Sequence, residues 1–269
     1  SRHVEANVMI TLGLDIGTQR VKAVILKDGA VVSRGQAFSG FDATKAAEEA
    51  AAQALNVANL NRQDIAYSVA TGSSMENPPK TDSTVSMMGA DAKAGVFFFP
   101  KARTIIDIGA EEARAIKCDE KGVMMDFVIN ERCAAGAGAF IESMARALEV
   151  KLEDMGPLSL KAERASPINA SCVIFGESDV VSLIHRQESK PEIARAVFDA
   201  MADRISSMVH RLGVNPDVVL IGGVAKDVGF FASLKRKLGV EILVPEFPDY
   251  AGALGAALAA ASRAKETQK

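Results

Sequence analysis

Two stretches decide the fold: LGLDIGTQRVK at residues 12–22 and IIDIGAEEAR at residues 105–114. In each, an apolar run leads into an Asp-Ile-Gly turn, and a second run rich in apolar and β-branched residues leads away. This pattern predicts a strand, a tight glycine turn and a second strand. The match continues into a further hairpin-type turn, at residues 27–31 in the first copy and 119–123 in the second. We therefore expect two lobes built on one plan.

The Asp-Ile-Gly turn suits phosphate binding. Glycine lets backbone N–H groups point at one position, and an aspartate at the end of a strand can hold the water shell of a magnesium ion. A single copy is equally typical of an ordinary hairpin. Its repetition at a matching register favours a pair of turns that grip one nucleotide.

Composition fits a two-domain enzyme or binding protein. The 269 residues are 48% hydrophobic and 24% charged, enough to build a full core. The net charge of −3 and the scattered basic residues argue against nucleic-acid binding. We find neither a signal peptide nor an apolar run of roughly 18 residues, so no membrane is expected and the cytoplasm is the expected location. Three cysteines argue against a disulfide framework.

The periodicity and the breaker residues place the remaining elements. In the first lobe we expect a helix over 42–56, a strand over 65–71, a loop over 75–82, a helix over 83–95 and a passage between lobes at 96–100. In the second lobe we expect helices over 134–150, 171–185, 190–212 and 225–238, with strands over 217–221 and 240–244. The predicted domains are 1–100 and 101–251, with a small-residue helix at 252–264 packing back on the first.

Three motifs resemble those of the actin, sugar-kinase and chaperone ATPase superfamily: residues 15–18 and 107–109 resemble its phosphate motifs, and 221–225 its adenosine motif. The resemblance implies an α/β fold of two duplicated ribonuclease H-like lobes, each a mixed β-sheet with flanking helices. Residues 130–138, 171–180 and 252–258 resemble a narrower group, the activators of 2-hydroxyacyl-CoA dehydratases and the ATPase subunits of benzoyl-CoA reductase. The Asp-Ile-Gly-Ala form of the second turn is more similar to the reductase subunits.

The resemblance assigns roles in binding ATP or ADP with Mg²⁺. Asp15 and Asp107 are expected at the metal and its waters, and Glu111 stands where many relatives carry glutamine, so it is a candidate general base. The alternative for Glu111 is a solvated hairpin edge, and for Gly222 and Gly223 a plain strand-to-helix turn. The residues expected to cradle the nucleotide are Gly17, Thr18, Gln19, Lys22, Gly109, Ala110, Gly136, Gly138, Gly222 and Gly223.

Two cysteines carry the remaining motifs. Cys133 and Cys172 each lie at a predicted helix start, where the helix dipole favours a thiolate. A 4Fe-4S cluster normally takes four thiolates, so one chain is incomplete. The resemblance implies one cluster shared by two subunits, each giving two cysteines. Cys118 has no motif around it and is expected to be a buried, unreactive thiol.

These expectations combine into an ATP-hydrolysing iron-sulfur subunit that delivers low-potential electrons for acyl-CoA reduction, with benzoyl-CoA reductase as the first choice. The alternative is a homodimeric activator of a 2-hydroxyacyl-CoA dehydratase. From other classes, a small-molecule kinase of the same superfamily and a non-catalytic nucleotide-dependent scaffold stay open. The expected partners are a second ATPase subunit, catalytic reductase or dehydratase subunits, and a ferredoxin or similar electron donor.

Overall fold

The computed structural model describes residues 8–75, 80–130, 136–169 and 171–267. The chain divides into two compact units. The first draws on residues 1–97 and 250–269, and the second on residues 98–249. Each unit contains one five-stranded sheet.

The sheet of the first unit has the order β3-β2-β1-β4-β5. Strand β1 pairs antiparallel with β2 and parallel with β4, so the sheet is mixed. Asp28 and Gly29 both have positive φ, which gives the β2–β3 hairpin a turn matching the twist of its strands. The strand bounds are β1 (Ile10–Ile16), β2 (Arg20–Lys27), β3 (Ala30–Phe38), β4 (Tyr67–Thr71) and β5 (Ser83–Thr84).

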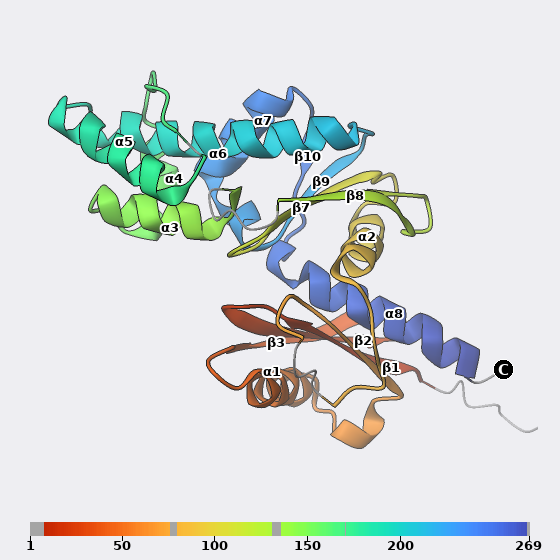
Figure 1. Ribbon diagram of the computed structural model, residues 1–269. Coiled ribbons are helices and arrows are strands. Elements are labelled where there is room, and N and C mark those ends of the chain that lie inside the picture. Colours follow the sequence, from red (N-terminus) through yellow and green to blue (C-terminus); the bar gives the residue numbers. More distant parts are fainter. Residues whose placement is uncertain (1–7, 76–79, 131–135, 170, 268–269) are drawn as a thin grey trace, which may run out of the picture. The chain divides into compact units, whose positions relative to one another are not determined.

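Two helices cover opposite faces of this sheet, α1 (Ala43–Ala58) and α8 (Ala251–Thr267), and α2 (Met87–Phe98) precedes the second unit in the chain (Figure 1). Both sheet-covering helices approach closely because their inner faces are built of small residues. A Cβ placed on Gly13 of β1 would lie 2.0 Å from the carbonyl oxygen of Ala253 in α8. A Cβ on Gly35 of β3 would lie 2.1 Å from the carbonyl oxygen of Ala50 in α1. Backbone therefore packs on backbone at both faces.

The sheet of the second unit has the order β10-β9-β6-β7-β8. Strand β6 pairs antiparallel with β7 and parallel with β9, as β1 does with β2 and β4. The strand bounds are β6 (Thr104–Ile108), β7 (Ala113–Cys118), β8 (Met124–Asn130), β9 (Val218–Ile221) and β10 (Ile242–Leu243). The predicted duplication and the α/β fold class are thus confirmed.

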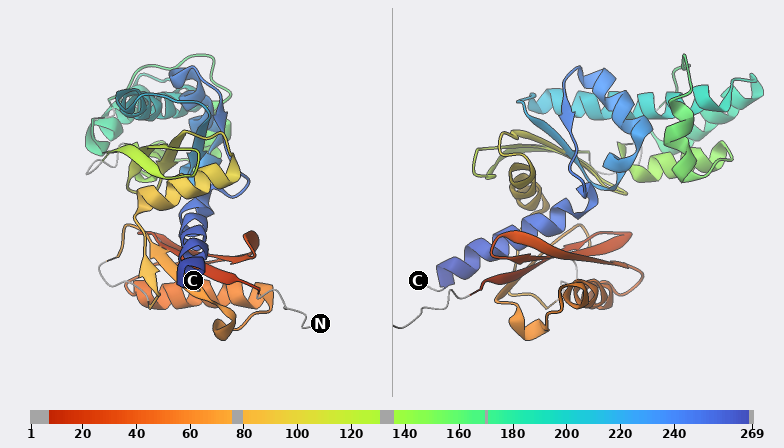
Figure 2. Two further views of the ribbon diagram at one scale, coloured as in Figure 1. Left: turned by 90° about the vertical axis from the view of Figure 1, so that its right-hand side faces the viewer. Right: turned by 180° about the vertical axis from the view of Figure 1, so that it is seen from behind.

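Helices of the second unit surround an apolar core centred on Phe140, Phe198 and Phe230, all fully buried. The long helix α6 packs along α7, and α3, α4 and α5 gather near its N-terminal half (Figure 2). The helix bounds are α3 (Gly138–Ala147), α4 (Leu152–Ser159), α5 (Val173–His185), α6 (Lys190–Leu212) and α7 (Val228–Leu238). Short 3-10 turns occupy η1 (Arg62–Asp64), η3 (Gly223–Lys226) and η4 (Pro248–Tyr250).

Several predicted boundaries are wrong for identifiable reasons. The helix expected over 83–95 begins only at Met87, because Ser83 and Thr84 pair with β4 as a parallel strand. It then continues to Phe98, through residues taken as a passage between lobes. The helix expected over 225–238 is divided at Asp227, whose carboxylate accepts the N–H groups of Gly229 and Phe230 and so caps α7.

Helix α4 was not anticipated, since its sequence contains Gly156 and Pro157. The helix expected over 134–150 is observed as α3, Gly138–Ala147, and residues 131–135 lie outside the described part. The expected loop over 75–82 likewise includes residues 76–79, which are not described. In the described ranges, none of the helices combines the length and apolar character that a membrane span requires.

The contact between α8 and β1 gives a first prediction. Gly13→Ala forces a methyl group into the backbone of Ala253 and Ala257, which cannot rotate away. We expect the free energy of unfolding to fall by about 1–3 kcal/mol or more, as for an overpacked core. Urea denaturation measures this.

Gly89→Ala in α2 is the matched control. Its new Cβ meets first the Ser86 hydroxyl, 3.0 Å away on a side chain that can move. Alanine also favours the helix, so this variant should unfold at the wild-type denaturant concentration or slightly above it. Equal stability of the two variants would contradict the tight packing of α8 on β1.

Candidate functional site

The first Asp-Ile-Gly turn joins β1 to β2, and two hydrogen bonds from Ser39 hold it in place. The Ser39 hydroxyl donates to the Gly17 carbonyl at 2.6 Å, and the Ser39 N–H donates to the Gln19 carbonyl at 3.1 Å. A Cβ on Gly17 would lie 2.7 Å from the carbonyl oxygen of Arg20, so the tight turn requires glycine. Thr18 and Gln19 are exposed at its tip.

Asp15 lies one residue before the end of β1. Lys22 and Gly252 lie beside it, and Gly72 lies beside the next residue, Ile16. Asp15 is the register partner of Lys22 across the β1–β2 pair, which places a basic side chain beside the carboxylate. The start of α8 approaches so closely that a Cβ on Gly252 would lie 2.9 Å from Asp15 Oδ2. Gly72, just after β4, has a φ of +129° and lies against the backbone of Ile16.

The second turn has the same strand register, and here the two charged side chains form a buried ion pair. Asp107 and Arg114 are register partners across β6 and β7, and Arg114 Nη2 donates to Asp107 Oδ2. Arg114 Nη1 also donates to Glu112 Oε1 at 2.9 Å. The Asp107 and Arg114 side chains are each 9% exposed. One guanidinium therefore neutralises the buried Asp107 and orients Glu112.

Backbone contacts hold the start of α3 against the second turn. The Gly138 N–H donates to the Gly109 carbonyl at 3.0 Å, and the Ala139 N–H donates to the Ala110 carbonyl at 2.8 Å. A Cβ on Gly138 would lie 3.2 Å from Val224 Cγ2. Gly138 thus joins the second turn to the segment that follows β9.

Gly222 completes this arrangement at the end of β9. Its φ of +90° favours glycine, and a Cβ there would lie 2.3 Å from the Ile108 carbonyl oxygen and 2.4 Å from Asp107 Oδ1. Its N–H donates to the Pro248 carbonyl at 2.9 Å. Beside it, Lys226 Nζ lies 2.8 Å from Asp249 Oδ1. The adenosine-type turn therefore packs directly on the Asp107 strand.

The second unit thus gathers Asp107, Gly109, Ala110, Gly138 and Gly222 into one site. Gly223 lies next to them with nothing within 4 Å of its would-be Cβ, and Glu111 is exposed at the edge of the turn. Gly136 packs against Asn130, because a Cβ there would lie 2.1 Å from Asn130 Nδ2. The first unit brings Asp15, Gly17, Thr18, Gln19 and Lys22 together.

Three residues at these sites were missed by sequence reasoning: Arg114, Gly72 and Gly252. The repeat contained a signal for the first, since Arg114 occupies the position in the second copy that Lys22 occupies in the first. Gly72 follows β4 as Gly222 follows β9. Gly252 begins the 252–258 motif, but its contact with Asp15 could not be read from the sequence because Asp15 is at the other end of the chain.

The described cysteines lie in different environments. Cys118 is buried, its thiol lies 3.7 Å from the Ala102 carbonyl oxygen, and burial raises the pKa of this thiol above its ordinary value. Cys172 is half-buried at the N-cap of α5, and neither thiol is in a disulfide. Cys133 lies outside the described residues. Among those described, no three His, Cys, Asp or Glu residues gather as a metal site.

Residues 12–260 match the BadF/BadG/BcrA/BcrD ATPase family. The chain belongs to this family. It is 39% identical to the activator of lactoyl-CoA dehydratase from Anaerotignum propionicum, covering 96% of this chain and all of that protein. It is 34% identical to a subunit of benzoyl-CoA reductase from Thauera aromatica, covering 94% of each.

A solved structure agrees with the family. The activator of the 2-hydroxyisocaproyl-CoA dehydratase from Clostridium difficile, with bound ADPNP, has a TM-score of 0.90 and 37% identity, covering 97% of each chain. The recognised family, the ATPase activity class and the binding of adenine nucleotide are therefore confirmed. The preference for benzoyl-CoA reductase is not favoured, because the two activators are the more similar. The Asp-Ile-Gly-Ala turn on which that preference rested covers only four residues.

The buried pair in the second unit gives a second prediction. Arg114→Ala leaves the Asp107 carboxylate buried without its cation, so the free energy of unfolding should fall by about 3–5 kcal/mol. Lys117→Ala on the same strand is the control and should change it by no more than about 0.5 kcal/mol, because Lys117 is only partly buried. Urea denaturation of both variants decides, and a wild-type midpoint for Arg114→Ala would count against the pair's role.

Proposed function

We propose that this chain is the ATP-hydrolysing activator of a 2-hydroxyacyl-CoA dehydratase. The similarity to two such activators across nearly the whole chain carries the proposal. The packing of Gly222 against Ile108 and Asp107 supports it, since this packing brings the adenosine-type turn next to the second Asp-Ile-Gly turn. A reductase component is the second candidate, supported by the 34% identity to the benzoyl-CoA reductase protein from Thauera aromatica.

For nucleotide binding, we propose that the backbone of Gly17, Thr18 and Gln19 contacts phosphate oxygens, with Lys22 adding charge. Asp15 and Asp107 would bind Mg²⁺ through its waters, and Gly109 and Ala110 would line the second phosphate site. Gly222 and Gly223 would receive the adenosine. The Gly138 N–H donates to the Gly109 carbonyl, so we assign Gly138 the role of holding the second turn in place.

For electron transfer, we propose a 4Fe-4S cluster bound by Cys133 and Cys172 from each of two subunits. Cys172 suits such a ligand because it is half-buried rather than enclosed in the core and lies at the N-cap of α5. Beside it on α5, Ile174 and Phe175 are 72% and 59% exposed, which suits coverage by a second subunit. The cluster would supply single electrons of low potential from a ferredoxin-type donor to the dehydratase.

The adenosine turn gives a third prediction. Gly223→Ala adds a methyl group where nothing lies within 4 Å, so the fold should be unaffected. If nucleotide approaches this backbone closely, the methyl group should weaken ATP binding by about tenfold or more, the effect of roughly 1.4 kcal/mol. Titration calorimetry measures the affinity, and thermal unfolding without nucleotide verifies the fold. Unchanged affinity would remove Gly223 from the site.

Glu111 gives a fourth prediction. Glu111→Ala should lower the ATP hydrolysis rate by about two orders of magnitude, the usual effect of losing a positioned acid–base group, without weakening nucleotide binding. Glu111→Gln should keep part of the rate, because an amide can still orient water. Glu120→Ala, an exposed acid in the next hairpin, is the control. Wild-type hydrolysis by Glu111→Ala would make Glu111 a solvated hairpin edge.

The cluster proposal is tested by iron analysis of anaerobically purified protein. Cys172→Ser should lose the iron and the visible absorbance while still binding ATP. Cys118→Ser should keep the iron and the visible absorbance, because Cys118 is buried in the core. A colourless wild-type protein that phosphorylates a small molecule would instead favour a kinase.

A further inference from the structure

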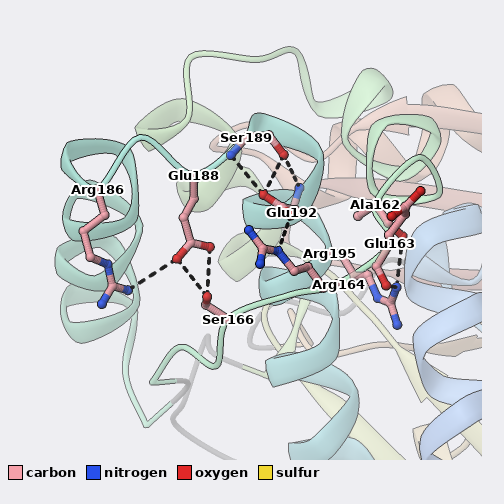
Figure 3. A network of polar contacts seen from close by, with 9 residues as sticks. All are labelled: Ala162, Glu163, Arg164, Ser166, Arg186, Glu188, Ser189, Glu192 and Arg195. Atoms are coloured by element: carbon pink, nitrogen blue, oxygen red, sulfur yellow. Dashed lines mark hydrogen bonds and ion pairs between the residues drawn. The ribbon is translucent and has the colours of Figure 1, made fainter.

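The segment between α4 and α5 ends at Cys172 and is tied to the protein at both ends. We call residues 161–169 the strap. Its first half lies on α6, where Arg195 Nη1 donates to the carbonyl oxygens of Ala162 and Glu163 at 3.0 and 3.1 Å. Arg164 Nε donates to Glu192 Oε1 at 2.7 Å (Figure 3).

The middle of the strap is bound by the turn between α5 and α6. The Ser166 hydroxyl lies 2.8 and 2.9 Å from the two carboxylate oxygens of Glu188. Arg186 Nη2 lies 3.8 Å from Glu188 Oε1 on its other side, as Figure 3 shows. The strap is therefore bound at three successive points to elements that carry no cysteine.

The far end of the strap is bound by α5 itself. The Asn169 N–H donates to Asp179 Oδ2 at 2.6 Å, and the Ser171 N–H donates to Asn169 Oδ1 at 2.7 Å. Cys172 follows directly as the N-cap of α5, with its carbonyl accepting the Gly176 N–H. The first turn of α5 lies close to the end of the strap, since a Cβ on Gly176 would lie 3.3 Å from the Asn169 carbonyl oxygen.

We propose that Asp179 is a positioning residue for Cys172: its carboxylate fixes Asn169, Asn169 fixes Ser171, and the thiol is thereby held at the start of α5. This inference rests on the proposed function, in which Cys172 binds a cluster. Asp179 lies seven residues after Cys172, two helical turns along the same side of α5. Residues that orient a metal ligand in this way are typically worth 10–100-fold in metal affinity.

The test uses the full chain, reconstituted anaerobically with iron and sulfide. Asp179→Ala should release iron to a chelator about tenfold faster or more, with an altered spin-resonance spectrum of the reduced cluster. Asp179→Asn should keep the wild-type iron release and spectrum, because its amide oxygen can accept the Asn169 N–H. Ser182→Ala is the control, since its hydroxyl donates to the Ser178 carbonyl of the same helix and does not contact the strap.

A second measurement requires no cluster. In iron-free, reduced protein, iodoacetamide should modify Cys172 of Asp179→Ala about tenfold faster than wild type, the factor expected from losing a hydrogen bond to a charged acceptor. Asp179→Asn and Ser182→Ala should react at about the wild-type rate. Peptide mass spectrometry distinguishes Cys172 from the other two cysteines.

The two measurements separate the inference from the proposed function. If wild type binds iron and Asp179→Ala matches it in iron release and alkylation, the positioning role is wrong and the cluster proposal stands. If wild type binds no iron, the cluster proposal fails, and the alkylation rates alone decide whether Asp179 positions the thiol. Faster alkylation in Asp179→Ala that asparagine fails to reverse would also overturn the role.

Discussion

Two close backbone contacts organise both halves of this protein. Gly72 and Gly222 have positive φ, and each lies where a Cβ would be 2.3 Å from the carbonyl oxygen of Ile16 or Ile108. Because each glycine follows the strand parallel to the one that carries the Asp-Ile-Gly turn, the two loops of each unit leave the same edge of its sheet. Ligands of α/β proteins bind at this edge, beyond the carboxyl ends of parallel strands.

The duplicated units differ at the aspartate of the Asp-Ile-Gly turn. Asp15 faces Lys22 on a partly exposed strand end, and Asp107 faces Arg114 in a buried one. Arginine suits the buried position because its planar guanidinium can bind Asp107 and Glu112 together. In the second unit, the same ion pair offsets the burial of charge and holds the turn in shape.

The two described cysteines lie in contrasting environments. Burial keeps Cys118 as a neutral thiol, the state of a core residue. Cys172 has the opposite surroundings: a helix N-terminus, partial exposure and a neighbour, Ser171, that is bound to the strap. The strap is bound to α6, and α6 is linked to α7 through Asp199, which pairs with Arg236 at 2.7 Å. Since α7 begins just beyond the adenosine turn, the second unit offers a continuous set of contacts from that turn to Cys172.

The sequence by itself determined the repeat, the mixed sheets, the long helix over 190–212 and the residues of both turns. These follow from local patterns: apolar runs, glycine turns and helix caps. Helix α4 was not predicted because Gly156 and Pro157 weaken its local helix signal, and strand β5 because it forms only by pairing with β4. The break at Asp227 is a local cap inside a segment whose apolar pattern predicts one continuous helix. Likewise, only the tertiary structure decided that Arg114 binds Asp107, that Gly252 packs on Asp15 and that Asp179 holds the strap. These contacts join residues on different elements, and their pairing depends on how those elements pack.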